Sequence, residues 1–176
     1  IGSPNGVTRV RLDAAAKKWS ATFEHLPRPR VAVLIGGASK SHSFSEDDAR
    51  RFANSLKTLT AQNMGVMVTT SRRTGDAQTK IIRDMLTGAN AYVFDGEGEN
   101  PYAGLLALAD AILVTSESTN MAVEAAATGK PVYIVDIPGG GAKFDRLHET
   151  LRNRGIARIF AGKIEQWTYE PLNETA

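Results

Sequence analysis

Short apolar segments alternate with longer amphipathic segments along most of the chain. The segment 31–35 reads Val-Ala-Val-Leu-Ile without interruption, and the other short segments are mostly apolar as well. Strands that are apolar throughout are typical of a parallel sheet covered by helices on both faces. The pattern predicts strands at 31–35, 66–70, 91–94, 111–114 and 132–135, and helices at 12–26, 46–62, 77–86, 101–109, 119–127 and 144–153.

The expected helix ends carry suitable residues. Ser45 precedes three acidic residues at 46–48, where a hydroxyl can cap the helix and the acids favour its positive end. Gly88, Gly129 and Gly155 stand where left-handed helix stops are expected. The alternation predicts an α/β fold, a Rossmann-like three-layer domain with a parallel sheet.

Composition narrows the class of protein. The 176 residues suffice for one domain, and the 42% hydrophobic share with a mean hydropathy of −0.22 is that of a globular protein. A net charge of +2 is too small to indicate a nucleic-acid surface. The absence of cysteine excludes disulfides and a thiolate nucleophile, and it fits a reducing compartment, so we expect a cytoplasmic protein.

The apolar stretch Gly104–Val114 is interrupted by Asp110 and is too short to cross a bilayer, so no transmembrane segment is expected. The chain begins at Ile1 and shows no leader, which suggests a fragment of a longer protein. We expect residues 1–26 to be a lead-in segment with a helix from a preceding N-terminal half, and residues 27–176 to form the domain.

Ligands of an open parallel sheet bind outside the carboxyl ends of its strands, so the loops there are the candidate sites. The first such loop offers backbone N–H groups at Gly36 and Gly37, a hydroxyl at Ser39 and a cation at Lys40, which together suit phosphate. It matches neither the dinucleotide fingerprint nor the P-loop. A plain strand-to-helix turn is the alternative.

Two further loops carry charged residues. Arg72 and Arg73 could bind a diphosphate through bidentate hydrogen bonds, or form a solvated basic turn. The acidic loop 95–102 fits a polar turn with a helix cap better than a cation site, because it lacks a full ligand spacing. His25, His42 and His148 lie on unrelated segments. No metal is therefore expected.

The segment 115–131 is the most specific. A polar loop with Ser118, Thr119 and Asn120 enters a helix rich in small residues, so a ligand can approach the helix start closely. Glu124 lies on an otherwise apolar, alanine-rich face, where a carboxylate needs a partner. The partner would be either a neighbouring basic residue in an ion pair or the diol of a ribose.

This segment, with Gly129-Lys130-Pro131 at its end, resembles the helix motif of GT-B glycosyltransferases. The resemblance implies that Glu124 binds the ribose of a sugar nucleotide. It also implies that the loop at Gly36 and Gly37 contacts phosphate and that the backbone near Phe94 contacts the base.

A closer resemblance is to the mitochondrial fission ELM family, whose C-terminal half looks like a GT-B nucleotide-binding domain. It runs from about Leu26 to the chain end, with Ser116-Glu117-Ser118 where an Asp-Ser pair is expected and Ala38 interrupting the Gly-Gly-Ser form of the first loop. The matching segments are Leu26-Pro27-Arg28-Pro29-Arg30, Ser71-Arg72-Arg73-Thr74, Gly98-Glu99-Asn100-Pro101-Tyr102, Thr128-Gly129-Lys130-Pro131-Val132-Tyr133, Lys143-Phe144 and Trp167-Thr168-Tyr169-Glu170-Pro171-Leu172.

These resemblances imply a domain that binds a nucleotide-diphosphate sugar in a GT-B-like glycosyltransferase, with no cofactor. The acceptor site and the catalytic base would lie on the missing N-terminal half, so no catalytic residue is assigned. The alternative is a non-catalytic adaptor with a degenerate transferase fold, which is compatible with peripheral association at a membrane. An epimerase-type oxidoreductase is disfavoured because the dinucleotide fingerprint is absent.

If the preceding half of the protein is missing, the face of the domain that carries the candidate loops should expose apolar side chains or unsatisfied polar groups, because a contact between domains would otherwise cover them.

Overall fold

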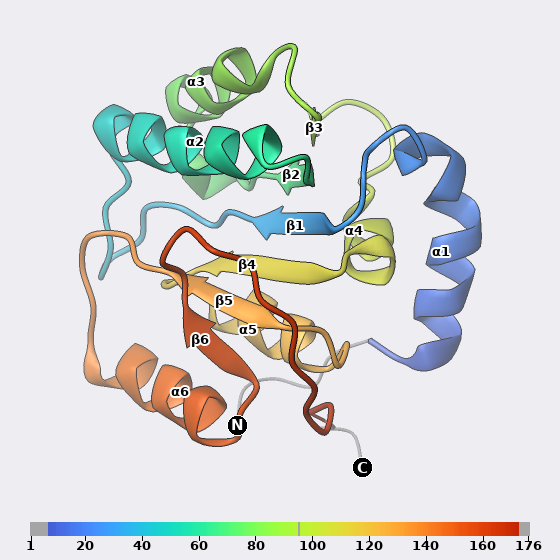
Figure 1. The fold of residues 1–176 in the computed structure, drawn as a ribbon. Helices are drawn as coiled ribbons and strands as arrows, with labels where there is room; N and C mark the ends of the chain where they lie inside the picture. The colour runs from blue at the N-terminus through green and yellow to red at the C-terminus, as the bar shows by residue number, and fades with distance from the viewer. Residues whose placement is uncertain (1–6, 95, 173–176) are drawn as a thin grey trace.

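A computed structural model describes residues 7–94 and 96–172 as one parallel six-stranded sheet between layers of helices (Figure 1). The strand order is β3-β2-β1-β4-β5-β6, and every neighbouring pair is parallel. The strands are β1 (Arg30–Leu34), β2 (Gly65–Thr69), β3 (Ala91–Val93), β4 (Ala111–Thr115), β5 (Val132–Val135) and β6 (Ala157–Ile159). The helices are α1 (Arg9–Phe23), α2 (Glu46–Ala61), the 3₁₀ turn η1 (Arg72–Thr74), α3 (Asp76–Leu86), α4 (Tyr102–Leu108), α5 (Thr119–Ala126) and α6 (Ala142–Asn153). The predicted α/β class and parallel sheet are confirmed.

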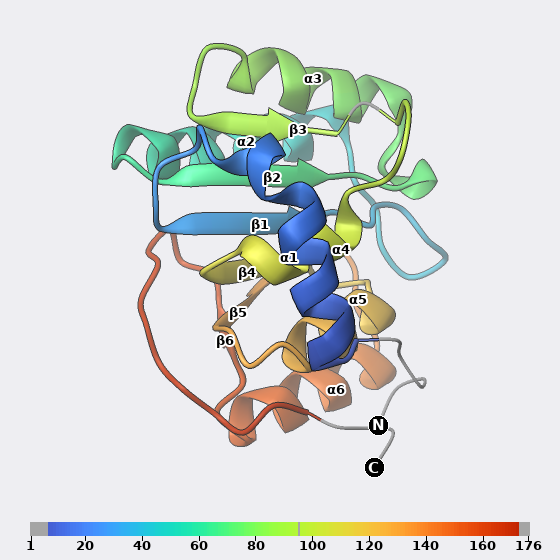
Figure 2. The same cartoon turned by 90° about the vertical axis from the view of Figure 1, so that its right-hand side faces the viewer.

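Each face of the sheet has its own core, because successive side chains of a strand point to opposite faces. In β1, Ala32 and Leu34 join the core under α1, α4, α5 and α6, whereas Val31 and Val33 join the core under α2 and α3. All four side chains are fully buried. Figure 2 shows α1 lying across α4, and β1, β2 and β3 pointing the same way. The carboxyl ends of the strands therefore share one edge, as expected.

The helix ends follow the predicted chemistry. Ser45 and Asp48 form a capping box at the start of α2, and Gly88, Gly129 and Gly155 have left-handed φ angles of 82°, 80° and 73°. The first helix lies three residues earlier than the predicted 12–26. It starts at Arg9 because Thr8 caps it, accepting a hydrogen bond from the N–H of Arg11 at 3.2 Å. It packs on α4, and its assignment to a preceding half stays a prediction.

Two short elements were missed, β6 and the 3₁₀ turn η1, because three residues are too few to show a period. The tail after β6 returns across the sheet (Figure 1). The Trp167 ring packs edge-on against Tyr133 with centroids 5.2 Å apart, and its indole N–H donates to the Gly155 carbonyl at 2.9 Å. Within the described ranges, no helix has the length and apolarity needed to cross a membrane.

Candidate functional site

The strand order reverses between β1 and β4, and this switch point is where open α/β sheets bind ligands. The chain leaves β1 for α2 on one face and leaves β4 for α5 on the other (Figure 1). A cleft of about 340 Å³ opens at this edge, and four strand-end loops contribute to it. This switch-point cleft is lined by Ser39, Lys40, Ser41, Arg73, Glu117, Ser118, Thr119, Asn120, Lys143 and Phe144.

The structure brings together part of the predicted site. The candidates that line the switch-point cleft are Ser39, Lys40, Arg73, Ser118, Thr119 and Asn120. The candidates outside its lining are Gly36, Gly37, Arg72, Phe94 and Glu124. Segments as far apart in the sequence as the first and fourth candidate loops therefore meet at one place.

The N–H groups of the first-loop glycines are already engaged in hydrogen bonds, and a phosphate contact from them stays a prediction. The N–H of Gly36 donates to the Thr115 hydroxyl at 2.9 Å, and the N–H of Gly37 donates to the Glu117 carboxylate at 3.2 Å. Both residues are buried, and a Cβ at Gly36 would collide with the Glu117 carboxylate. The glycines are therefore used for close packing, and a phosphate contact from either N–H would require its present bond to break.

Glu117 is the residue that holds these loops together. Its side chain is 0% exposed, and its carboxylate accepts hydrogen bonds from Thr115, Gly37 and Arg73. The Arg73 guanidinium lies 3.0 Å from Glu117 Oε2 and is 45% exposed. A buried carboxylate without such partners would be costly. The Arg73 guanidinium is therefore used in the ion pair with Glu117 and is not free for a ligand.

The cations that remain in the switch-point cleft are lysines. Lys40 and Lys143 are exposed, and neither has a carboxylate partner within the described ranges. Helix α5 also starts here, and Ser118 at its N-cap position makes no side-chain cap bond. The first N–H groups of a helix carry partial positive charge. Two lysines and this helix start make the cleft electrostatically suited to an anion.

Glu124 has a neutral partner in place of the basic residue considered as one alternative. Its Oε1 accepts a hydrogen bond from the Tyr102 hydroxyl at 2.8 Å. Burial and the neighbouring Glu124 carboxylate raise the pKa of Tyr102, so its proton stays on this bond. Glu124 follows Asn120 by four residues on α5, which places it about one helical turn from the cleft.

Lys130, in the Gly-Lys-Pro segment, has a structural role. Its ammonium donates to the carbonyls of Leu106 and Ala107, both at 2.6 Å, and so caps the C-terminal end of α4. Burial lowers the pKa of Lys130 to about 8. This part of the motif therefore connects two elements at the edge opposite the cleft.

Sequence reasoning missed Ser41, Glu117, Lys143 and Phe144 as cleft residues. Phe144 is half-buried and lines the cleft, whereas Leu147 and Leu151 on the same helix are buried in the core. The available signal was topological, because residues 143 and 144 follow β5 and the carboxyl end of every parallel strand reaches the same edge. The Phe144 ring packs edge-on against His42, with 4.7 Å between their centroids.

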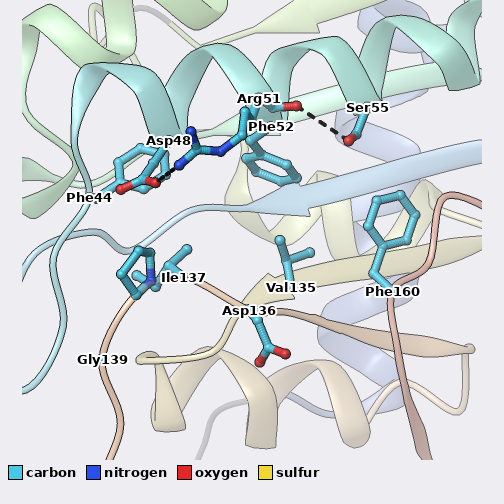
Figure 3. Close-up of a pocket in the computed structure, with 11 residues that line it drawn as sticks. Phe44, Asp48, Arg51, Phe52, Ser55, Val135, Asp136, Ile137, Gly139 and Phe160 are labelled. Atoms are coloured by element: carbon cyan, nitrogen blue, oxygen red, sulfur yellow. Dashed lines mark hydrogen bonds and ion pairs between the residues drawn. The ribbon is translucent and has the colours of Figure 1, made fainter.

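A second, larger pocket of about 670 Å³ lies between α2 and the end of β5 (Figure 3). Its wall combines apolar side chains with polar and charged groups, and Phe52 faces Val135 and Phe160 across the space. Its charged groups are the ion-paired Asp48 and Arg51, and Asp136. No predicted site residue lies in it, and its net charge does not suit phosphate.

The expected exposure at the cleft face is not found in the described part of the chain. The exposed large hydrophobic residues are Val10 on α1 and Ile159 on β6, and neither lines the cleft. No buried side-chain polar atom of the described residues lacks a partner. The cleft is instead lined by hydroxyls and charged groups that water solvates well.

The sheet, its helices and the placement of the cleft define a glycosyltransferase-like Rossmann fold. The glycosyltransferase WaaG, which is involved in lipopolysaccharide biosynthesis, superposes with a TM-score of 0.50 at 16% identity, over 89% of this chain and 41% of that one. The family model for mitochondrial fission ELM1 matches residues 1–176, so the chain belongs to the mitochondrial fission ELM1 family.

Two relatives cover nearly the whole chain. The mitochondrial fission protein ELM1 of Arabidopsis thaliana is 34% identical over 99% of this chain and 42% of its own length. The uncharacterized protein RP120 of Rickettsia prowazekii (strain Madrid E) is 36% identical over 98% of this chain and 51% of its own length. The chain therefore spans about half the length of these relatives.

Proposed function

We propose that this chain is the nucleotide-diphosphate-sugar-binding domain of a GT-B-like glycosyltransferase. The observation that carries the proposal is the switch-point cleft, where Lys40, Lys143 and the uncapped start of α5 converge. The two lysines come from loops about a hundred residues apart in the sequence, which a plain solvated turn would not require. A diphosphate supplies the negative charge that these groups can stabilise.

In this proposal the diphosphate occupies the cleft and the ribose lies one helical turn along α5, against Glu124. The base then lies near Phe94, which the resemblance to GT-B transferases implies. We propose that the catalytic base and the acceptor site belong to the rest of the protein, because the relatives are about twice as long as this chain. The chain alone would then bind the sugar nucleotide without turnover, and no cofactor is needed.

Calorimetry tests the proposal with UDP-glucose, ADP-glucose and GDP-mannose as probes, because the base is not known. At least one should bind, and the double variant K40Q/K143Q should bind it more than tenfold more weakly, since two charge-assisted contacts are lost. The matched control is K57Q, which removes one lysine charge from the exposed face of α2. Equal loss in both variants would show a non-specific charge effect and contradict the site.

A non-catalytic adaptor is the second candidate, and one observation favours it. The N–H groups of Gly36 and Gly37 are engaged with Thr115 and Glu117, so the two glycines of the loop that resembles the phosphate-contacting loop of transferases have no free N–H for a ligand. If none of the three sugar nucleotides binds at millimolar concentration, the adaptor becomes the better proposal. The fold would then serve binding to other proteins or peripheral attachment to a membrane.

A further inference from the structure

The carboxylate of Glu117 is fixed in the wall of the switch-point cleft. It lies beneath Gly36, and its three donors come from β4, the β1 loop and the β2 loop. Its side chain is 0% exposed, so solvent does not reach the carboxylate. The carboxylate is therefore held against the Arg73 guanidinium behind the loop.

One of the positive charges of the cleft forms an ion pair with this carboxylate. Arg73 neutralises Glu117 across 3.0 Å, which leaves Lys40 and Lys143 as the cations without a carboxylate partner in the part of the chain that the structure describes. Arg72 is exposed and does not line the cleft. The cleft thus has two unpaired cations for its ligand.

Two unpaired cations match a ligand that has two negative charges. A diphosphate diester, as in a sugar nucleotide, has one ionised oxygen on each phosphate. A free nucleoside diphosphate ends in a phosphate monoester, which loses a further proton near neutral pH and brings an additional negative charge. That additional charge has no unpaired cation in the cleft, because Glu117 holds the Arg73 guanidinium in an ion pair.

We infer that Glu117 is a specificity-determining residue that makes this site prefer a diphosphate diester over a nucleotide with a terminal phosphate. The inference rests on the proposed function and deepens it, because it assigns the charge of the substrate. It also gives Glu117 a consequence beyond stabilising the loops. Release of the cleaved nucleoside diphosphate after transfer of a sugar would be favoured by the same lack of a third free cation.

The test compares UDP-glucose with UDP, ADP-glucose with ADP, and GDP-mannose with GDP, by calorimetry in EDTA so that no divalent cation screens the phosphates. The wild-type chain should bind the sugar nucleotide at least as tightly as the matching diphosphate. In E117Q, Arg73 is released to the cleft and the carboxylate charge is gone, so affinity for the diphosphate should rise about tenfold relative to the sugar nucleotide. An unchanged ratio in a folded E117Q chain would overturn the inference.

A second variant avoids the buried pair if E117Q does not fold. N120K adds a cation at an exposed position of the cleft and should shift the ratio in the same direction, whereas K40Q should shift it the opposite way. K57Q, outside the cleft, should leave the ratio unchanged. If the wild-type chain binds neither ligand of any of the three pairs, the proposed function fails together with the inference. If it binds them and no cleft variant alters the ratio, only the inference fails.

Discussion

At the scale of single residues, a substitution of Glu124 distinguishes a role in ligand binding from a role in stability. Because its partner is the neutral Tyr102 hydroxyl, the substitution E124Q leaves no charge unpaired, and the amide oxygen can still accept that bond. We predict a change of less than about 1 kcal/mol in the free energy of unfolding. Affinity for the sugar nucleotide should fall by about 1.5 to 3 kcal/mol, the range for hydrogen bonds to charged groups.

Calorimetry and a melting curve on the same E124Q sample measure both effects. E149Q is a suitable control, since Glu149 is an exposed acid on α6 outside the switch-point cleft. A lower melting temperature with unchanged affinity would assign Glu124 to the fold and remove the ribose contact from the proposal.

Lys130 makes stability depend on pH. Its pKa is about 8 in the folded protein and 10.5 in the reference state, so between these values the unfolded chain binds more protons and folding is favoured as the pH rises. The wild-type protein should therefore gain up to about 2 kcal/mol in unfolding free energy relative to K130M between pH 8 and pH 10. Urea titrations at several pH values measure this difference, in which titrations common to both proteins cancel. A difference that stays flat or falls over this window would show that Lys130 keeps its ordinary pKa.

At the scale of elements, the close approach of three loops at Gly36 gives a sharp test. A Cβ there would collide with the Glu117 carboxylate, and the substitution G36A should destabilise the fold by about 1 to 3 kcal/mol, as overpacking does. Gly140 is the matched control, since a Cβ there meets nothing within 4 Å and its φ is not left-handed. If G36A is as stable as G140A by chemical denaturation, the buried position of Glu117 is wrong.

Sequence patterns predicted most elements because their signals are local. An uninterrupted apolar run gave β1, and the serine with its following acids gave the start of α2 to the residue. The start of α1 was displaced because Thr8, whose cap bond defines it, has no distinctive sequence beside it. β6 was missed because two of its three residues are exposed, so it does not look like a buried strand.

At the scale of the whole molecule, the sequence predicted which loops meet at the candidate site but not which of their groups are free to bind a ligand. The parallel sheet brings the first and fourth candidate loops to one edge, and this follows from topology alone. That Arg73 and the Gly37 N–H are used by Glu117 depends on three loops packing in space, which no local pattern encodes. The cleft role of Lys143 was missed for a similar reason, because a lysine beside a phenylalanine also fits an ordinary helix start.

The tail after β6 contributes to stability through contacts that lie outside the switch-point cleft. Trp167 packs against Tyr133, donates to the Gly155 carbonyl, and has the Arg158 guanidinium 3.9 Å from its ring, all without belonging to a helix or strand. We predict that W167A lowers the free energy of unfolding by about 2 kcal/mol, less than for a fully buried tryptophan because the ring is half-buried.

For a chain of this length, that loss corresponds to a fall of roughly 4 to 8 °C in melting temperature. The control Q166A removes an exposed side chain from the same segment and should melt like the wild type. Because the Trp167 contacts lie outside the switch-point cleft, affinity for a sugar nucleotide should be unchanged in W167A when measured well below its melting temperature. Weaker binding by W167A under those conditions would mean that the tail and the cleft are coupled through the sheet, so that the Trp167 contacts affect both stability and ligand binding.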